Sequence, residues 1–261
     1  MSFVLLIGYA AIFFLLYKTF LIVWSLTYPF WIGRRRDLKE LAGANWAVIT
    51  GATDGIGRAM AFELAGQGFD LILISLRKER LGETASEINE NYPGIRIITI
   101  QYDFTVADPK LYETEIFAKL DGHEIGILDC GNCRSRKRHY LWDNLIYSAA
   151  KQYSNWLSEI LRKEYGAYGI TVQTLTPSWV QTKLSHNFTS KKQKETASVP
   201  TPEKYVQSAI KTIGLVPQTT GYFHHQIENQ FLLGLTPSFI RDKKLEKFAT
   251  AARKRAMRKD E

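Results

Sequence analysis

The sequence predicts an α/β fold in which a doubly wound parallel sheet follows an N-terminal transmembrane helix. Three observations lead to this prediction. The chain opens with a long apolar run, patterns typical of buried strands and amphipathic helices then alternate, and a glycine-rich turn joins the first strand to the first helix. With 261 residues, 45% of them hydrophobic, the chain can build one large domain and a small appendage.

The apolar run is predicted to be a membrane anchor. Residues 3–17 carry no charge, and a bilayer-spanning helix needs about 20 apolar residues, so Phe3 to Trp24 can span if Lys18 snorkels. A cleaved signal peptide is the alternative, but no basic residue precedes the run and no small-residue cleavage site closes it. Lysine and arginine follow the run and none precede it, so the main domain is expected in the cytosol.

The glycine-rich turn follows the first predicted strand, Trp46 to Thr50. Gly51 and Gly55 would let the backbone turn tightly and approach a phosphate, and Gly57 would let the next helix pack closely on the strand. An ordinary glycine-rich loop is the alternative. Because a second strand follows at Asp70 to Ser75, the turn sits in a βαβ unit, which favours a Rossmann-like dinucleotide site.

The end of the second strand indicates which dinucleotide would bind. An NAD-selective site holds an acid there against the ribose 2′-hydroxyl, whereas this chain has Ser75, Leu76 and Arg77. A hydroxyl and a guanidinium suit a 2′-phosphate, so NADP(H) is expected. Arg77 as a solvated loop charge is the alternative.

Two motifs resemble those of the short-chain dehydrogenase/reductase family. The spacing Thr50-Gly-x-x-x-Gly-Ile-Gly57 matches the family's glycine motif, and Tyr147-Ser-Ala-Ala-Lys151 matches its Tyr-x-x-x-Lys pair. The resemblance implies that Tyr147 is the acid in ketone reduction and that Lys151, one helical turn later, lowers the pKa of the tyrosine and holds the ribose. It also implies a serine that polarises the carbonyl. Ser135 is the weak candidate for that serine, and Asn132 or Cys133 would fall at the site in a different alignment.

The resemblance also implies a set of cofactor contacts around the carboxyl ends of the strands. Asp103 would contact the adenine or, equally, cap the next helix; Val180 would meet the carboxamide and Thr182 a phosphate or carboxamide oxygen. The full set is Gly51, Thr53, Asp54, Gly55, Ile56, Gly57, Ser75, Arg77, Asp103, Tyr147, Lys151, Val180 and Thr182.

The middle of the chain departs from the family pattern. After Gly126 to Asn132, predicted to be the next strand and its loop, the family has a long helix and a further strand before Tyr-x-x-x-Lys, but this chain reaches Tyr147 about fifty residues early, about one βα unit. The last strands are predicted at Gly169 to Thr176 and Thr220 to Ile227, with a lysine-rich substrate lid at 183–200.

Together these features resemble the membrane-bound branch that contains 17β-hydroxysteroid dehydrogenases and very-long-chain 3-oxoacyl-CoA reductases. The resemblance implies NADPH-dependent reduction of a ketone on a steroid or fatty acyl-CoA, with a homodimer as a further expectation. The alternative is a shortened pseudoenzyme that binds nucleotide or a membrane partner without turnover, since a central strand cannot be removed without re-pairing its neighbours.

The net charge of +8 does not indicate a nucleic-acid partner, because the basic clusters come without a nucleic-acid motif and suit a membrane surface or phosphate-bearing ligands. No metal site is expected: Cys130 and Cys133 read as reduced thiols rather than zinc ligands. The ending Arg258-Lys-Asp-Glu resembles an endoplasmic-reticulum retrieval signal. The expected organisation is a membrane anchor at 1–33, a basic linker at 34–45, a Rossmann-like domain at 46–240 and a basic tail at 241–261.

Overall fold

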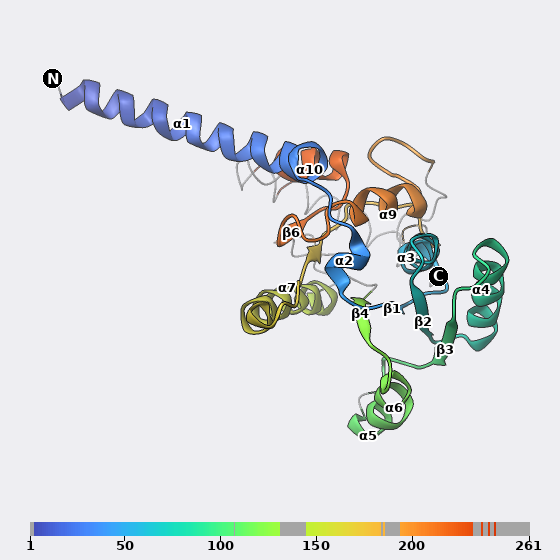
Figure 1. The fold of residues 1–261 in the computed structure, drawn as a ribbon. Coiled ribbons are helices and arrows are strands. Elements are labelled where there is room, and N and C mark those ends of the chain that lie inside the picture. The colour runs from blue at the N-terminus through green and yellow to red at the C-terminus, as the bar shows by residue number, and fades with distance from the viewer. Residues whose placement is uncertain are drawn as a thin grey trace, which may run out of the picture.

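The architecture was analysed in a computed structural model, which describes residues 3–106, 108–130, 145–183, 185, 194–231, 236, 240 and 243; for residues 145–151 only the course of the helix is described. A four-stranded sheet forms the centre, with helices packed around it, and the N-terminal helix stands out from the domain (Figure 1).

The central sheet is parallel throughout and has the strand order β3-β2-β1-β4. Its strands are β1 (Trp46–Thr50), β2 (Asp70–Ser75), β3 (Ile97–Gln101) and β4 (Ile125–Asp129). Because all four run in the same direction, their carboxyl ends meet at one edge of the sheet, which is the edge where ligands bind in open α/β folds.

The residues of β1 and β2 alternate between two hydrophobic cores, one on each face of the sheet. Ala47 and Leu71 face a large core with helix α3 (Gly55–Gly66), helix α4 (Lys78–Asn91) and helix α9 (Pro202–Ile210). Val48 and Ile72 face a smaller core, which the segment α5 (Pro109–Leu111), η2 (Tyr112–Phe117) and α6 (Ala118–Leu120) closes. Covered faces on both sides explain why these strands read as continuous apolar runs, and they confirm the doubly wound sheet.

The second half of the chain forms a separate, two-stranded parallel sheet. It pairs β5 (Thr174–Leu175) with β6 (Gln218–Thr219), and before it come the long helix α7 (Leu145–Tyr165) and the short 3₁₀ turn η4 (Gly166–Tyr168). Within the described residues, neither strand pairs with β4. A sheet interrupted after β4 is what the predicted loss of one βα unit would produce.

The prediction of a final strand over Thr220 to Ile227 is wrong. Only Gln218 and Thr219 are strand, and helix α10 (Phe223–Gln230) follows, so His224 and His225 are helical residues. The predicted strand at Gly169 to Thr176 is likewise shortened to the two residues of β5. Among the described residues, β5 and β6 pair only with each other, and a sheet of two strands is only marginally stable.

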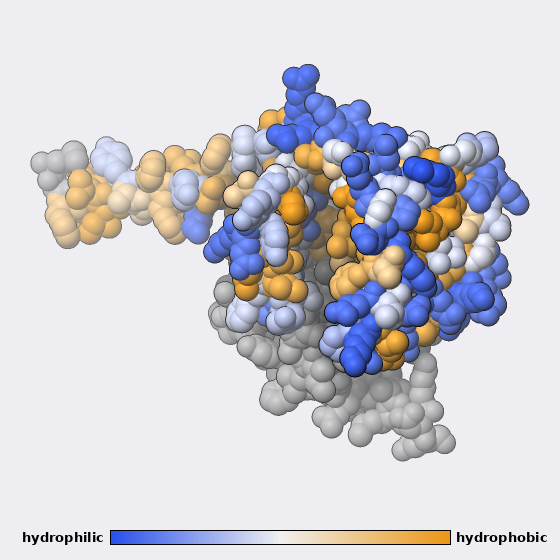
Figure 2. Space-filling model, turned by 60° about the horizontal axis from the view of Figure 1, so that its bottom comes forward, coloured by the Kyte–Doolittle hydropathy of each residue, from blue (hydrophilic) through white to orange (hydrophobic). Residues whose placement is uncertain are grey.

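The N-terminal segment begins with helix α1 (Phe3–Thr27), continues through the π-helical turn η1 (Tyr28–Ile32), and is followed by the short helix α2 (Leu38–Ala42). No residue of α1 is buried, and among the described residues this is the one helix long and apolar enough to cross a membrane. Figure 2 shows it as a largely apolar rod projecting from the domain.

Candidate functional site

The glycine turn lies at the carboxyl edge of the sheet, between β1 and α3. Gly51 and Gly55 have φ angles of 65° and 55°, in the region that strains residues with a β-carbon. The Gly51 N–H donates to Ile74 O at 2.8 Å, which fixes the turn to the neighbouring strand. Asp54 caps α3 by accepting from the Gly55 N–H at 2.8 Å.

Gly57 is where α3 comes closest to the turn. A β-carbon on Gly57 would lie 2.5 Å from the Gly51 carbonyl oxygen and 3.0 Å from that of Thr50. Both are backbone atoms, which cannot move aside as a side chain could. The close helix–strand approach predicted for this glycine is therefore present.

Two hydroxyl groups meet at the end of β2. Thr53 Oγ1 of the glycine turn lies 2.9 Å from Ser75 Oγ, in hydrogen-bonding contact. Arg77 is exposed just beyond, at the start of α4. The structure thus brings together two members of the predicted cofactor set, Thr53 and Ser75, with Arg77 near Ser75 in the chain.

Thr182, in the loop after β5, lies against the glycine turn. A β-carbon on Gly55 would lie 2.9 Å from Thr182 Cγ2, so the loop after β5 and the turn after β1 are in close contact. Thr182 is held by the buried Ser185, whose hydroxyl accepts from the Thr182 N–H at 3.0 Å and donates to Thr182 O at 2.8 Å. Val180 is buried in the large core, and Ile56 packs partly against it.

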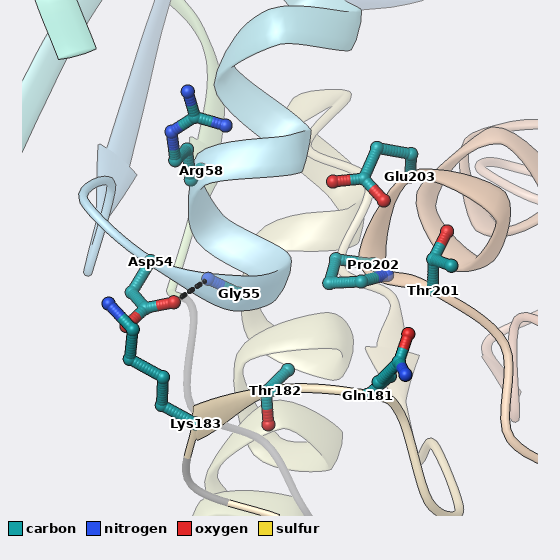
Figure 3. A pocket seen from close by; sticks show the side chains of 9 residues that line it. All are labelled: Asp54, Gly55, Arg58, Gln181, Thr182, Lys183, Thr201, Pro202 and Glu203. Atoms are coloured by element: carbon teal, nitrogen blue, oxygen red, sulfur yellow. Dashed lines mark hydrogen bonds and ion pairs between the residues drawn. The ribbon is translucent and has the colours of Figure 1, made fainter. Parts of the chain in front are cut away.

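A cavity of about 330 Å³ opens beside this contact, where the N-termini of α3 and α9 converge (Figure 3). Its lining is mostly polar and charged: Asp54, Gly55, Arg58, Gln181, Thr182, Lys183, Thr201, Pro202 and Glu203. Lys183 Nζ lies 3.2 Å from the Asp54 carboxylate. The N-termini of α3 and α9 favour an anionic group at this edge of the site, while the two basic side chains are paired with carboxylates, Arg58 with Glu87 and Lys183 with Asp54.

Asp103 follows β3 at the same edge. Its carboxylate accepts from the Thr105 N–H at 2.9 Å and from the Thr105 hydroxyl at 2.8 Å. The backbone bond from Thr105 holds the pKa of the Asp103 carboxyl below its usual range. The prediction that Asp103 caps the next helix is wrong, because Asp108 is the N-cap of α5 and Asp103 closes a local turn on Thr105. Its contact with the adenine stays a prediction.

Asp129 ends β4 and was not predicted as a site residue. Its Oδ2 is inaccessible to solvent and has no hydrogen-bond partner among the described residues. Burial raises the pKa of this carboxyl to about 6. Thr50, at the end of β1, contacts the Asp129 main chain with a hydroxyl-to-carbonyl distance of 3.4 Å, so Asp129 lies directly beside the glycine turn.

Tyr147 and Lys151 lie on α7, one helical turn apart, as their spacing predicted. Their side chains lie outside the part of the chain that the structure describes, as does the whole of Ser135. Cys133 also lies outside the described residues, and Cys130 is exposed.

Sequence reasoning missed three residues that organise this region: Ser185, Lys183 and His225. Burial lowers the pKa of His225 to about 4, so the ring is neutral; its Nδ1 accepts from the Ser178 N–H at 3.3 Å and its Nε2–H donates to Ser198 O at 3.2 Å. His225 thereby ties α10 to the loop after β5 and to the end of segment 183–200. The partners of Lys183 and His225 lie far away in the chain, and the turn that joins Ser185 to Thr182 has no distinctive composition, so no local pattern marks these residues.

A doubly wound parallel sheet with a glycine turn at its carboxyl edge defines a nucleotide-binding α/β protein. The profile of the short chain dehydrogenase family matches residues 45–121. A very-long-chain 3-oxoacyl-CoA reductase of Caenorhabditis elegans is 35% identical, over 97% of this chain and 95% of that protein. The chain belongs to the short-chain dehydrogenase/reductase family, whose members are oxidoreductases.

Two further relatives fit this assignment. A second Caenorhabditis elegans protein, provisionally named steroid dehydrogenase 2, is 30% identical over 98% of this chain and 96% of its own length. A solved structure described in work on 7β-hydroxysteroid dehydrogenase stereoselectivity shares the fold, with a TM-score of 0.64 at 18% identity, over 81% of this chain and all of that one.

The alignment with the 3-oxoacyl-CoA reductase also bears on the missing segment. It runs over 309 positions, 48 more than the 261 residues of this chain, so at least 48 positions face a gap here. This agrees with the predicted absence of about one βα unit and with the interruption of the sheet after β4.

Proposed function

We propose that the chain is an NADPH-dependent reductase of a ketone on a membrane-borne lipid, either a steroid or a 3-oxoacyl-CoA, with turnover slowed by the missing segment. The observation that carries the proposal is the turn after β1. It has the backbone conformation and close packing that a pyrophosphate site requires, and Thr182 covers it. The names of the two Caenorhabditis elegans relatives supply the two substrate classes.

The residues at the carboxyl edge fit a dinucleotide. Gly51, Gly55 and the N-terminus of α3 would hold the pyrophosphate, because a β-carbon on either glycine would be strained and the helix end favours an anion. Asp54, Ile56 and Gly57 would shape that turn. Val180 and Thr182 would lie toward the nicotinamide, and Asp103 toward the adenine.

The phosphate preference is assigned to the end of β2. Thr53 and Ser75 offer two adjacent hydroxyls there, Arg77 supplies a positive charge, and no acid stands where it would repel a 2′-phosphate. These groups support NADP(H) over NAD(H).

The proton-transfer step is assigned to α7. Tyr147 would donate its phenolic proton to the carbonyl oxygen of the substrate, while Lys151, one turn later, would lower the pKa of the phenol and hold the ribose. Ser135 is proposed to polarise the carbonyl. When bound, NADPH supplies the hydride that goes to the carbonyl carbon.

The cellular setting is proposed from the N-terminal helix and the basic residues that follow it. The exposed apolar helix α1 would anchor the chain in the endoplasmic-reticulum membrane, with residues 46–240 in the cytosol, the linker at 34–45 between them and the tail at 241–261 after them. A homodimer is part of the same proposal.

Turnover of two ketone classes by the full chain tests the function. The chain in lipid nanodiscs is given NADPH with a steroid ketone or a 3-oxoacyl-CoA, and oxidation of NADPH is followed by absorbance. We expect slow reduction of one class that Tyr147→Phe lowers by about 100-fold, with Tyr153→Phe, an exposed tyrosine on the same helix, as the control. Equal loss in both variants would refute the assignment to Tyr147.

The alternative function, a pseudoenzyme that binds nucleotide without turnover, is favoured by one observation: the sheet is interrupted after β4, beside the nucleotide edge. The same experiment separates the two functions. NADPH binding without reduction of either ketone class would establish the alternative.

The NADP preference has its own test. Ser75→Asp should weaken NADPH binding by about tenfold or more while leaving NADH binding unchanged or tighter, because a carboxylate repels the 2′-phosphate and accepts from a 2′-hydroxyl. Ser86→Asp on the exposed face of α4 is the matched control. Parallel losses for both nucleotides in Ser75→Asp would argue against a 2′-phosphate site at this strand end.

A further inference from the structure

Helix α10 packs against the domain end of the anchor and runs antiparallel to it. At its start, the ring of Phe223 meets that of Trp31, with centroids 4.4 Å apart; at its end, Gln230 Nε2 donates to Ser25 Oγ at 2.7 Å. From the start of α10 to its end, the residue that it contacts in the N-terminal segment therefore changes from Trp31 to Ser25. The C-terminal end of α10 points along α1 toward the N-terminus of the anchor, and Figure 1 shows the two helices together at this corner of the domain.

The level of that end relative to a bilayer follows from the length of α1. A helix rises 1.5 Å per residue and the hydrocarbon core is about 30 Å thick, so a span that begins at Phe3 reaches the far boundary near Ser25. Because Gln230 is bonded to Ser25, the next residue, Phe231, lies at about the depth where hydrocarbon gives way to headgroups.

The side chains on this corner suit that depth. Trp31, Ile32 and Phe231 are 62%, 56% and 58% exposed, which is costly in water and favourable in the interface. The three arginines at 34–36 follow directly and are exposed, where they can meet lipid phosphates. Aromatic side chains with a basic rim are the composition of a membrane-interface surface.

We infer that the corner formed by Trp31, Ile32 and Phe231 is a second membrane contact, and that its partner is the surface of the bilayer that α1 spans. The inference rests on the proposed membrane anchoring. Through His225, α10 also bonds the loops at Ser178 and Ser198. The contact would therefore fix the loops over the site relative to the bilayer, so that a lipid substrate reaches them from the membrane surface.

Depth-dependent quenching tests the contact in the full chain. In a background of Cys130→Ser and Cys133→Ser, Phe231→Cys is labelled with the fluorophore NBD and reconstituted into nanodiscs that contain a headgroup-nitroxide lipid. Phe117→Cys is the matched control, because Phe117 is also 58% exposed but belongs to η2, far from the anchor in Figure 1. We expect about twofold or greater quenching at position 231 and almost none at position 117.

The outcomes separate the contact from the anchor. A chain that co-elutes with nanodiscs but shows equal, weak quenching at both positions would overturn the contact and leave the anchor intact. A chain that does not co-elute would overturn both. If labelling at 231 unfolds the protein, the unmodified chain is photo-crosslinked to a diazirine lipid: adducts within 222–231 support the contact, and adducts confined to α1 overturn it.

Discussion

At Gly57, the close packing of α3 against β1 and the glycine turn requires a residue without a β-carbon. In Gly57→Ala the added methyl group would meet two backbone carbonyls, so α3 must move away from β1. We expect a loss of about 1–3 kcal/mol in unfolding free energy, as for other overpacked sites, and weaker NADPH binding. Denaturant unfolding and NADPH fluorescence titration of the full chain measure the two effects.

Gly82 provides the control for that change. It lies within α4 with nothing within 4 Å of the position of a β-carbon, so Gly82→Ala should stabilise the chain by about 0.5–1 kcal/mol and leave NADPH affinity unchanged. If Gly57→Ala behaved like Gly82→Ala, the close approach of α3 to the turn would not exist.

The buried carboxyl of Asp129 is expected to make the stability of the chain depend on pH. Its pKa of about 6 in the folded chain lies above the ordinary 3.8, so the folded state holds the proton more tightly than the unfolded state. The contribution of Asp129 to stability should thus be greatest below pH 4, decrease as pH rises from about 4 to about 6, and stay lower by about 3 kcal/mol above that. Asp129→Asn should remove this dependence and raise stability at pH 7.

Thermal melting of the full chain between pH 4 and pH 8 measures this effect, with Glu124→Gln, an exposed acid next to β4, as the control. A melting temperature of Asp129→Asn that follows the parent at every pH would show that the Asp129 carboxyl is solvated or paired.

At the scale of elements, β4 is less covered than β1 and β2 of the same sheet. In β1 and β2 both faces are buried, whereas Leu128 of β4 is 64% exposed on a strand that pairs only with β1 among the described residues. The side chain of a leucine in a parallel sheet normally lies under a covering helix.

The difference predicts unequal costs for the same substitution in β2 and β4, the two strands that flank β1. Leu73→Ala, in the fully buried β2, should lower unfolding free energy by about 2–5 kcal/mol, and Leu128→Ala by less than about 1 kcal/mol. Urea unfolding of both variants in the same detergent provides the comparison. Similar costs would mean that a further element covers β4.

The elements that the sequence predicted well are those whose partners are adjacent in the chain. The bounds of β1 and β2 agree with prediction, because apolar runs are local signals. Helix α10 was mistaken for a strand, since Tyr222, Phe223 and Ile227 carry no decisive period and its packing partners are Trp31 and Ser25, about 200 residues earlier.

The residues of the site also differ in whether a local signal in the sequence could predict them. The glycine turn could be predicted from local spacing, whereas the roles of Tyr147, Lys151 and Thr182 came from family resemblance and stay predictions. The support of Thr182 by Ser185 depends on a turn that no composition signals. Asp129 could not be identified in advance either, because an aspartate at a strand end shows its burial only after the sheet has formed.

At the scale of the whole molecule, the anchor, α10 and the nucleotide edge form one connected path. The anchor contacts α10, α10 holds two loops through His225, and the loop after β5 covers the glycine turn through Thr182. In this arrangement α1 and the site are connected through packed elements.

The central claim is that a dinucleotide lies across the turn between β1 and α3. Titration of the full chain in nanodiscs with NADPH, followed by the change in nicotinamide fluorescence, tests it most directly, with NADH titrated in parallel. The account predicts saturable NADPH binding with a dissociation constant on the order of micromolar, about tenfold or more tighter than for NADH. Fluorescence that stays linear in NADPH up to millimolar concentration, from a chain that melts cooperatively, would contradict it.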